Sequence, residues 1–114
     1  MSDHITLTKA EGTWSVRAGG AVLGETTNAL ELREGDYAPV IYFPRGDIAM
    51  AFLDASNKTS HCPHKGDASY YSVVTKSRVL QDAVWSYEEP NEAVAAIKGF
   101  LAFYPIEEIT VEQI

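Results

Sequence analysis

The sequence predicts a mostly β protein: a compact antiparallel β-sheet domain, barrel-like or tent-like, with one short helix near the C-terminus. Polar and apolar residues alternate with period two in several short runs. Gly, Pro, Asn and Asp separate these runs, as they do where turns connect antiparallel strands. Apolar residues at helical spacing occur in one late segment. The 114 residues fit a single β domain over residues 1–114.

The first half of the chain has the pattern of strands joined by tight turns. We expect strands over residues 5–8, 13–18, 21–26 and 40–43. Gly19-Gly20 supplies the positive φ angles of a two-residue hairpin turn. Segment 28–33 fits either a strand or a helical turn. Segment 48–53 carries apolar side chains at both parities, which predicts a central strand covered on both faces.

The second half of the chain continues this pattern. Its expected strands are residues 68–74, 79–87, 100–104 and 109–112. Residues 54–58 are polar and predict a loop, and residues 63–67 predict a tight turn. The short helix is expected to begin at Pro90 or Asn91 and to end at Gly99, which can adopt a left-handed conformation.

Composition restricts the classes of partner. Nine Lys and Arg against sixteen Asp and Glu give a net charge of -7, which repels a phosphate backbone and argues against nucleic acid as a partner. No apolar run approaches the roughly 20 residues that cross a bilayer, so we expect no membrane association. The single Cys62 excludes an internal disulfide and suits a reducing compartment. We therefore expect a cytoplasmic protein.

Residues 59–67 form the densest group of reactive side chains in the sequence. Thr59, His61 and Cys62 precede a Pro-His-Lys-Gly turn. Gly66 permits a backbone conformation that other residues avoid, and successive turn N–H groups can form an anion site to which Lys65 adds its charge. The alternative interpretation is a stable hairpin turn with a solvated lysine.

Cys62 has two interpretations. A neighbouring His61, His64 or Lys65 could ionise its thiol and make it a nucleophile. A free cysteine is more often a small buried apolar residue. His61, Cys62 and His64 are possible zinc ligands, but a structural zinc site needs four ligands in paired clusters. We therefore expect no metal and no cofactor.

Two further groups of side chains are candidates for a binding site. Tyr42 and Asp47 stand near the end of an apolar strand, where the carboxylate could orient a ligand or accept N–H bonds from its own turn. Aromatic walls could be formed by Trp85 and Tyr87, with Tyr70, Tyr71 and Tyr104, although core packing is the commoner fate of aromatic residues in strands.

A set of short motifs is spread along the chain from Trp14 onward. The motifs are Leu32-Arg33-Glu34-Gly35, Tyr42-Phe43-Pro44 with Asp47, Thr59 with Cys62-Pro63 and Lys65-Gly66, Ala68 with Tyr70, Trp85 with Tyr87 and Pro90, and Ile97-Lys98-Gly99 with Ala102-Phe103-Tyr104. Together they resemble the domain-of-unknown-function 427 family, labelled nucleotidyltransferase-like in some catalogues. The resemblance implies a compact, predominantly β fold whose motif residues gather around a pocket.

The residues themselves supply little for nucleotidyl transfer. That reaction normally uses carboxylates that hold Mg²⁺ against a triphosphate, and no closely spaced Asp pair follows a Gly-Ser turn here. Asp47 and Asp67 would have to meet in space. The sequence therefore assigns no reaction and does not decide whether the protein is an enzyme.

We predict a pocket for a small polar or anionic ligand around the Cys-Pro-His-Lys-Gly turn. The residues expected to bind the ligand are Tyr42, Asp47, Thr59, His61, Cys62, Lys65, Tyr70 and Trp85. The alternative function is a non-catalytic protein-interaction module, which the acidic composition and small size also fit. The sequence does not indicate the oligomeric state.

Overall fold

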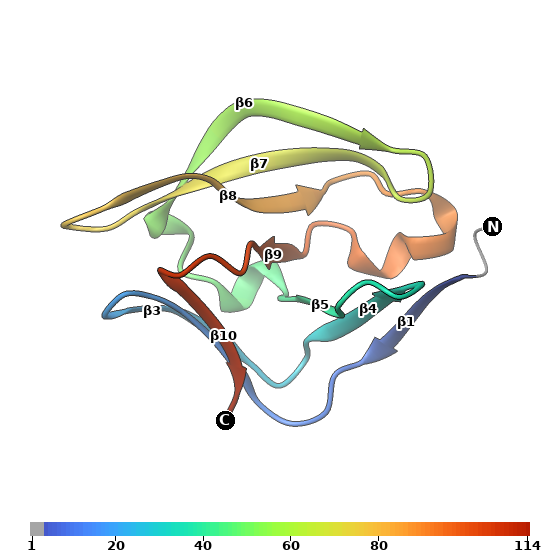
Figure 1. Ribbon diagram of the computed structural model, residues 1–114, viewed down its shortest axis with the longest axis horizontal. Coiled ribbons are helices and arrows are strands. Elements are labelled where there is room, and N and C mark those ends of the chain that lie inside the picture. The colour runs from blue at the N-terminus through green and yellow to red at the C-terminus, as the bar shows by residue number, and fades with distance from the viewer. Residues whose placement is uncertain (1–3) are drawn as a thin grey trace.

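The computed structural model describes residues 4–114 and contains three antiparallel sheets (Figure 1). The first sheet has the order β1-β4-β5, with bounds Ile5–Lys9, Leu30–Glu34 and Val40–Tyr42. The second has the order β10-β2-β3, with bounds Ile109–Gln113, Trp14–Ala18 and Ala21–Thr26. The third has the order β6-β7-β8-β9, with bounds Leu53–Cys62, Gly66–Val74, Val79–Tyr87 and Leu101–Phe103.

The sheets form two layers that meet along a seam. The four-stranded sheet lies above the two three-stranded sheets in Figure 1. Phe43 and Leu101 exchange two backbone hydrogen bonds of 2.8 Å, which connect β5 to β9 across the layers. Residues 4–114 form a tent-like β domain that does not close into a barrel. The predicted class is confirmed.

Two apolar clusters fill the space between the layers. The first contains Val16, Leu23, Phe43, Val73, Val84 and Leu101 among its buried members. The second contains Leu32, Tyr42, Ala68, Tyr70, Tyr87, Val94, Ile97 and Ala102. Tyr42 and Phe43 are neighbours in sequence but belong to different clusters, because successive side chains of an extended chain point in opposite directions. Neighbouring positions of an extended segment can therefore contribute to different clusters.

Several predicted elements in the first half are confirmed. Strand β3 has the predicted bounds, and Ala18 pairs with Ala21 across the two-residue turn. Gly19 has a φ of 59°, a left-handed conformation that suits glycine, whereas Gly20 does not have the positive φ that we predicted for it. The ambiguous segment 28–33 is resolved as strand β4, which pairs with β1 and β5.

The prediction of a central strand at 48–53 is wrong. The segment contains one 3₁₀ turn, η3 (Met50–Phe52), which follows the single bridge of Ile48 to Gly24. Another 3₁₀ turn, η2 (Arg45–Asp47), directly precedes the segment. The apolar side chains reach the first cluster while the backbone turns instead of extending. The second half of β8, with Ala83 and Val84 both buried, is covered on both faces instead.

The predicted polar loop at 54–58 is also wrong, since these residues belong to β6. Within the described residues this strand pairs only with β7, so it forms one edge of the four-stranded sheet. A register shift lies between Ala55 and Thr59. Most of its side chains are exposed, so the polar composition reflects an edge strand facing water.

The predicted short helix is present as a 3₁₀ helix, η4 (Glu92–Ile97). The backbone departs from helical φ and ψ at Val94, so η4 consists of two short turns separated by a kink. Val94 and Ile97 are both buried in the second cluster. Gly99 follows with a φ of 74°, as predicted. In residues 4–114, no helix has the length and apolar character needed to cross a membrane.

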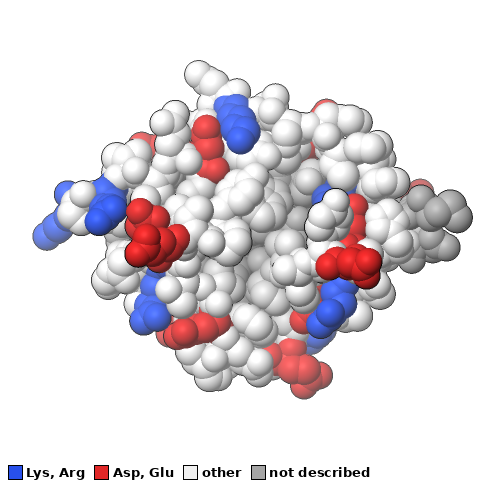
Figure 2. All heavy atoms as spheres, in the orientation of Figure 1, with Lys and Arg blue, Asp and Glu red and all other residues white. Residues whose placement is uncertain are grey.

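Charged residues of both signs are interspersed on the surface. Figure 2 shows one face of the molecule, on which acidic and basic side chains lie around a hollowed, uncharged centre. Arg33 bonds to Glu31 at 2.6 Å, and Arg17 lies 3.5 Å from Glu112. Such exposed pairs contribute about 0–1 kcal/mol each, so the fold depends on its apolar clusters.

Candidate functional site

A cavity of about 260 Å³ lies between the two layers, beside the second apolar cluster. Its lining residues are Leu32, Glu34, Tyr37, Ala38, Val40, Tyr42, Lys65, Tyr70, Trp85, Tyr87 and Tyr104. Four of the eight predicted binding residues are among them. A larger cavity lies elsewhere, but this smaller one combines aromatic walls with an ion pair, which is the combination that orients a polar ligand.

The turn between β6 and β7 brings Lys65 to the cavity. The N–H of Lys65 donates to the carbonyl of Cys62 at 3.2 Å, which closes the turn. The carbonyl of Lys65 accepts from the N–H of Asn91 at 2.9 Å, and the Asn91 side chain donates to the Pro63 carbonyl at 3.1 Å. The turn is therefore held against the segment that precedes η4.

Gly66 allows this close approach. Its φ is 112°, a region that residues with a side chain rarely adopt. A Cβ at this position would lie 3.4 Å from both the Asn91 nitrogen and the Glu89 oxygen. The predicted special role of this glycine is confirmed in its backbone.

Lys65 forms an ion pair with Glu34 at the edge of the cavity. The ammonium donates to Oε1 of Glu34 at 2.8 Å, and the side chains are only 14% and 18% exposed. The other carboxylate oxygen of Glu34 lies 3.4 Å from Nε2 of His4. The hydrogen bond from Lys65 lowers the pKa of the Glu34 carboxyl against the opposing effect of burial, and the charge of Lys65 adds to the lowering.

Aromatic side chains form the walls. Tyr70 and Trp85 are direct partners across β7 and β8, so they share one face of the sheet. The indole N–H of Trp85 donates to the hydroxyl of Tyr42 at 3.1 Å across the layers. The rings of Trp85 and Tyr104 lie 4.6 Å apart between centroids. Trp85 thus connects both layers at the cavity.

The phenols around the cavity stay protonated at neutral pH. Burial raises the pKa of Tyr42 to about 12, against the lowering effect of the Trp85 hydrogen bond. Burial and the neighbouring Tyr70 raise the pKa of Tyr104 to about 12. The pKa of Tyr87 is raised as well, chiefly by burial. These hydroxyls can donate or accept hydrogen bonds, but they do not serve as bases near pH 7.

A family model described as "Domain of unknown function (DUF427)" matches residues 6–113. The chain belongs to the DUF427 family. No curated protein matches it.

Four residues of this DUF427 domain that we predicted as binding residues do not line the cavity. The Asp47 carboxylate accepts a 2.8 Å hydrogen bond from the hydroxyl of Thr26 and ties η2 to the end of β3. Thr59 is exposed on β6. His61 bonds to Asp67 at 2.6 Å on the exposed side of the hairpin. Cys62 is half-buried and packs against the second apolar cluster.

These positions bear on the alternative chemistries. Within the described part of the chain, neither His61 nor His64 hydrogen-bonds to the thiol of Cys62, and His61 hydrogen-bonds to Asp67 instead. Asp47 and Asp67 have separate partners and do not meet at the cavity. Among residues 4–114, no three His, Cys, Asp or Glu side chains converge as metal ligands.

Sequence reasoning did not place Glu34 among the binding residues. The pattern of β4 contained a signal. Leu30 and Leu32 form the apolar face of this strand, and the next residue on the same face, Glu34, carries a carboxylate. Tyr87 and Tyr104 were weighed only as possible wall residues. Their side chains line the same cavity as Trp85.

Proposed function

We propose that this DUF427 domain binds a small polar ligand in the cavity beside Lys65. The observation that carries the proposal is the Lys65–Glu34 ion pair, which stands at the edge of a cavity walled by Tyr42, Tyr70 and Trp85. Ligand sites commonly join apolar and aromatic walls to a few convergent polar groups. The cavity volume, about 260 Å³, lies just below the range of about 300–1,000 Å³ that ligand sites occupy, so it limits the ligand to a small molecule.

The ion pair favours a ligand that is polar but uncharged. A fully anionic group at Lys65 would either displace Glu34, which would leave a partly buried carboxylate without its cation, or lie beside Glu34 and be repelled by its charge. A ligand with an adjacent donor and acceptor, such as an amide or a diol, can contact both charges and leave them paired. The aromatic walls favour a flat ring or the apolar face of a sugar.

The proposal covers binding and assigns no reaction. The phenols at the cavity remain protonated near pH 7, because burial raises the pKa of Tyr42 and Tyr104. Glu34 is the one carboxylate among the lining residues, and Lys65 holds it in its charged form. The lining residues of this cavity therefore give no support to the nucleotidyltransferase-like label of the family.

A thermal-shift screen of sugars, nucleosides, sugar phosphates and small carboxylates tests the proposal. A ligand present at 100 times its Kd stabilises the folded state by about 2.7 kcal/mol, which is easily detected. We expect the shift for a matching ligand to be lost in Lys65→Met and kept in the control Lys98→Met, since Lys98 is exposed and lies outside the cavity. Equal shifts in both variants, or none in the wild type, would remove the site.

A specific feature favours the alternative function, a protein-interaction module. Strand β6 presents ten residues at a sheet edge, and most of their side chains are exposed. A free edge can accept a further strand from a partner. Such a partner would slow hydrogen exchange at outward-facing amides of β6, and ligand binding in the cavity without any change at β6 would count against this function.

A further inference from the structure

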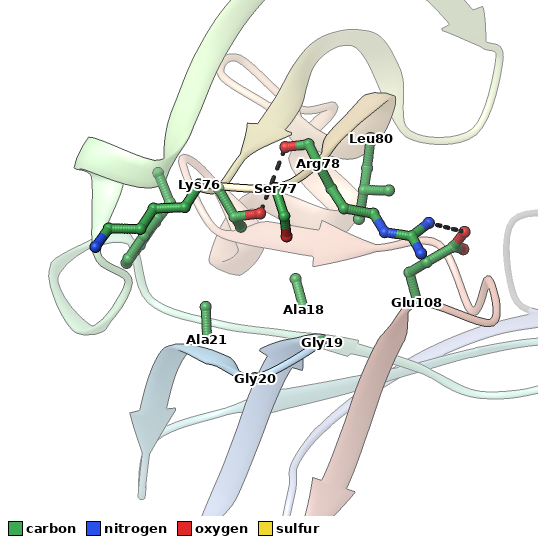
Figure 3. A pocket seen from close by; sticks show the side chains of 11 residues that line it. Ala18, Gly19, Gly20, Ala21, Lys76, Ser77, Arg78, Leu80 and Glu108 are labelled. Carbon is green, nitrogen blue, oxygen red and sulfur yellow. Dashed lines mark hydrogen bonds and ion pairs between the residues drawn. The ribbon is translucent and has the colours of Figure 1, made fainter.

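The larger cavity, of about 460 Å³, lies between two hairpin ends. The β2–β3 turn forms one side, and the β7–β8 turn with its flanking residues forms the other (Figure 3). The lining includes no residue of the cavity beside Lys65. Its volume lies within the range of about 300–1,000 Å³ that small-molecule sites occupy.

The interior of this cavity is apolar. Ala18, Ala21 and Leu80 line it from the strand ends, and Phe52 of η3, which packs against the first apolar cluster, also lines it. Gly19 and Gly20 line it without side chains, and a Cβ at either position would meet no atom within 4 Å. The absence of side chains at the hairpin tip therefore keeps the space open.

Two cations flank the cavity. Lys76 and Arg78 belong to one turn, and Figure 3 shows their side chains leaving it in opposite directions. Arg78 lies 3.4 Å from Glu108, so part of its charge is neutralised. Lys76 has no hydrogen bond or ion pair within residues 4–114 and is exposed. A chain of net charge -7 thus places an uncompensated cation beside an apolar cavity.

We propose that this second cavity binds a small amphiphilic anion: a carboxylate with an apolar chain. The chain occupies the space between the hairpin ends, where Leu80 and Phe52 remove it from water. The carboxylate lies at the rim beside Lys76, where the ammonium supplies the complementary charge. A cationic amphiphile of the same length meets that ammonium and is repelled.

Octanoate, octanol and octylammonium are matched probes for this site. We expect octanoate to bind most tightly by calorimetry and to shift the methyl resonances of Ala18, Ala21 and Leu80 in NMR spectra. Lys76→Glu should weaken octanoate binding by about fivefold, as reversal of an exposed charge does, and leave octanol binding unchanged. Lys98→Glu alters the net charge equally at an exposed position away from the cavity and should have no effect.

A second pair of variants tests the place of binding. Gly20→Trp puts a large side chain at the lining of the cavity, and Gly46→Trp does the same at an open position outside it; neither glycine needs a positive φ. Octanoate binding should be lost in the first variant and kept in the second. Equal binding of octylammonium and octanoate, equal effects of Lys76→Glu and Lys98→Glu, or methyl shifts confined to other residues would overturn the proposal.

Discussion

Substitution of Lys65 by methionine tests the ion pair at the proposed site. Methionine keeps most of the apolar stem and removes the ammonium, so Glu34 loses the 2.8 Å hydrogen bond that holds its charge. The two side chains are 14% and 18% exposed, which places the pair between a surface pair and a fully buried one. The free energy of unfolding of this variant therefore reports how much the ion pair at the edge of the cavity stabilises the fold.

The magnitude follows from these exposures. Exposed pairs contribute about 0–1 kcal/mol, and removal of one partner from a buried pair costs about 3–5 kcal/mol. Glu34 keeps its 3.4 Å contact with His4, which offsets part of the loss. We expect a loss of about 2 kcal/mol, or a decrease in melting temperature of about 8 °C for a domain of this size.

Urea unfolding of a double-mutant cycle is the assay. Lys65→Met, Glu34→Gln and the double variant isolate the coupling between the two charges, and the double variant should lose less stability than the sum of the single variants. Arg33→Met is the control, because its pair with Glu31 is exposed and its loss should cost less than about 1 kcal/mol. Additive losses, or a loss for Lys65→Met no larger than for Arg33→Met, would refute the reasoning.

Four further outcomes are expected. The pKa of Glu34 is lowered below 4.5 in the folded state, so its charge stabilises the fold above that pH and this stabilisation is lost on acidification. The difference in free energy of unfolding between the wild type and Glu34→Gln, measured in urea, should therefore become smaller below pH 4.5. Tyr42 and Tyr104 should stay un-ionised in ultraviolet titrations until about pH 12, with stability falling between pH 10 and 12; ionisation of every phenol near pH 10 would contradict their burial. Tyr42→Phe removes the acceptor of the Trp85 N–H and should cost about 1 kcal/mol in urea. Gly66→Ala should cost about 1–3 kcal/mol and Gly20→Ala nothing, since Gly66 alone of the two has a positive φ; equal melting temperatures would disprove this.

The sequence predicts the fold best where local chemistry decides the structure. The Gly19-Gly20 turn and the strands beside it follow from glycine conformation and period-two alternation. Segment 48–53 was mispredicted because a continuous apolar run also suits a chain that forms an isolated bridge and a 3₁₀ turn against a core. Segment 54–58 was mispredicted because polar residues on an exposed edge strand resemble those of a loop.

The candidate site was predictable only in part, because parity and layer contacts decide it. Tyr42 of β5 and Lys65 of the β6–β7 turn line one cavity although they come from different layers, and the family motifs contain both. Asp47 lies close to Tyr42 in sequence, but η2 turns its carboxylate to Thr26. The partner of Lys65, the carboxylate of Glu34, depends on contact between two layers that local patterns do not report.

The two tryptophans allow the central proposal to be tested directly. The indole N–H of Trp85 donates to the Tyr42 hydroxyl at the cavity. Trp14 lies in β2 of another sheet, and its indole N–H donates to the Glu11 carbonyl. In nitrogen–proton correlation spectra, titration with the best ligand of the thermal-shift screen should move the Trp85 indole resonance and leave the Trp14 resonance in place. A ligand that stabilises the protein while the Trp85 resonance stays fixed would contradict binding in this cavity.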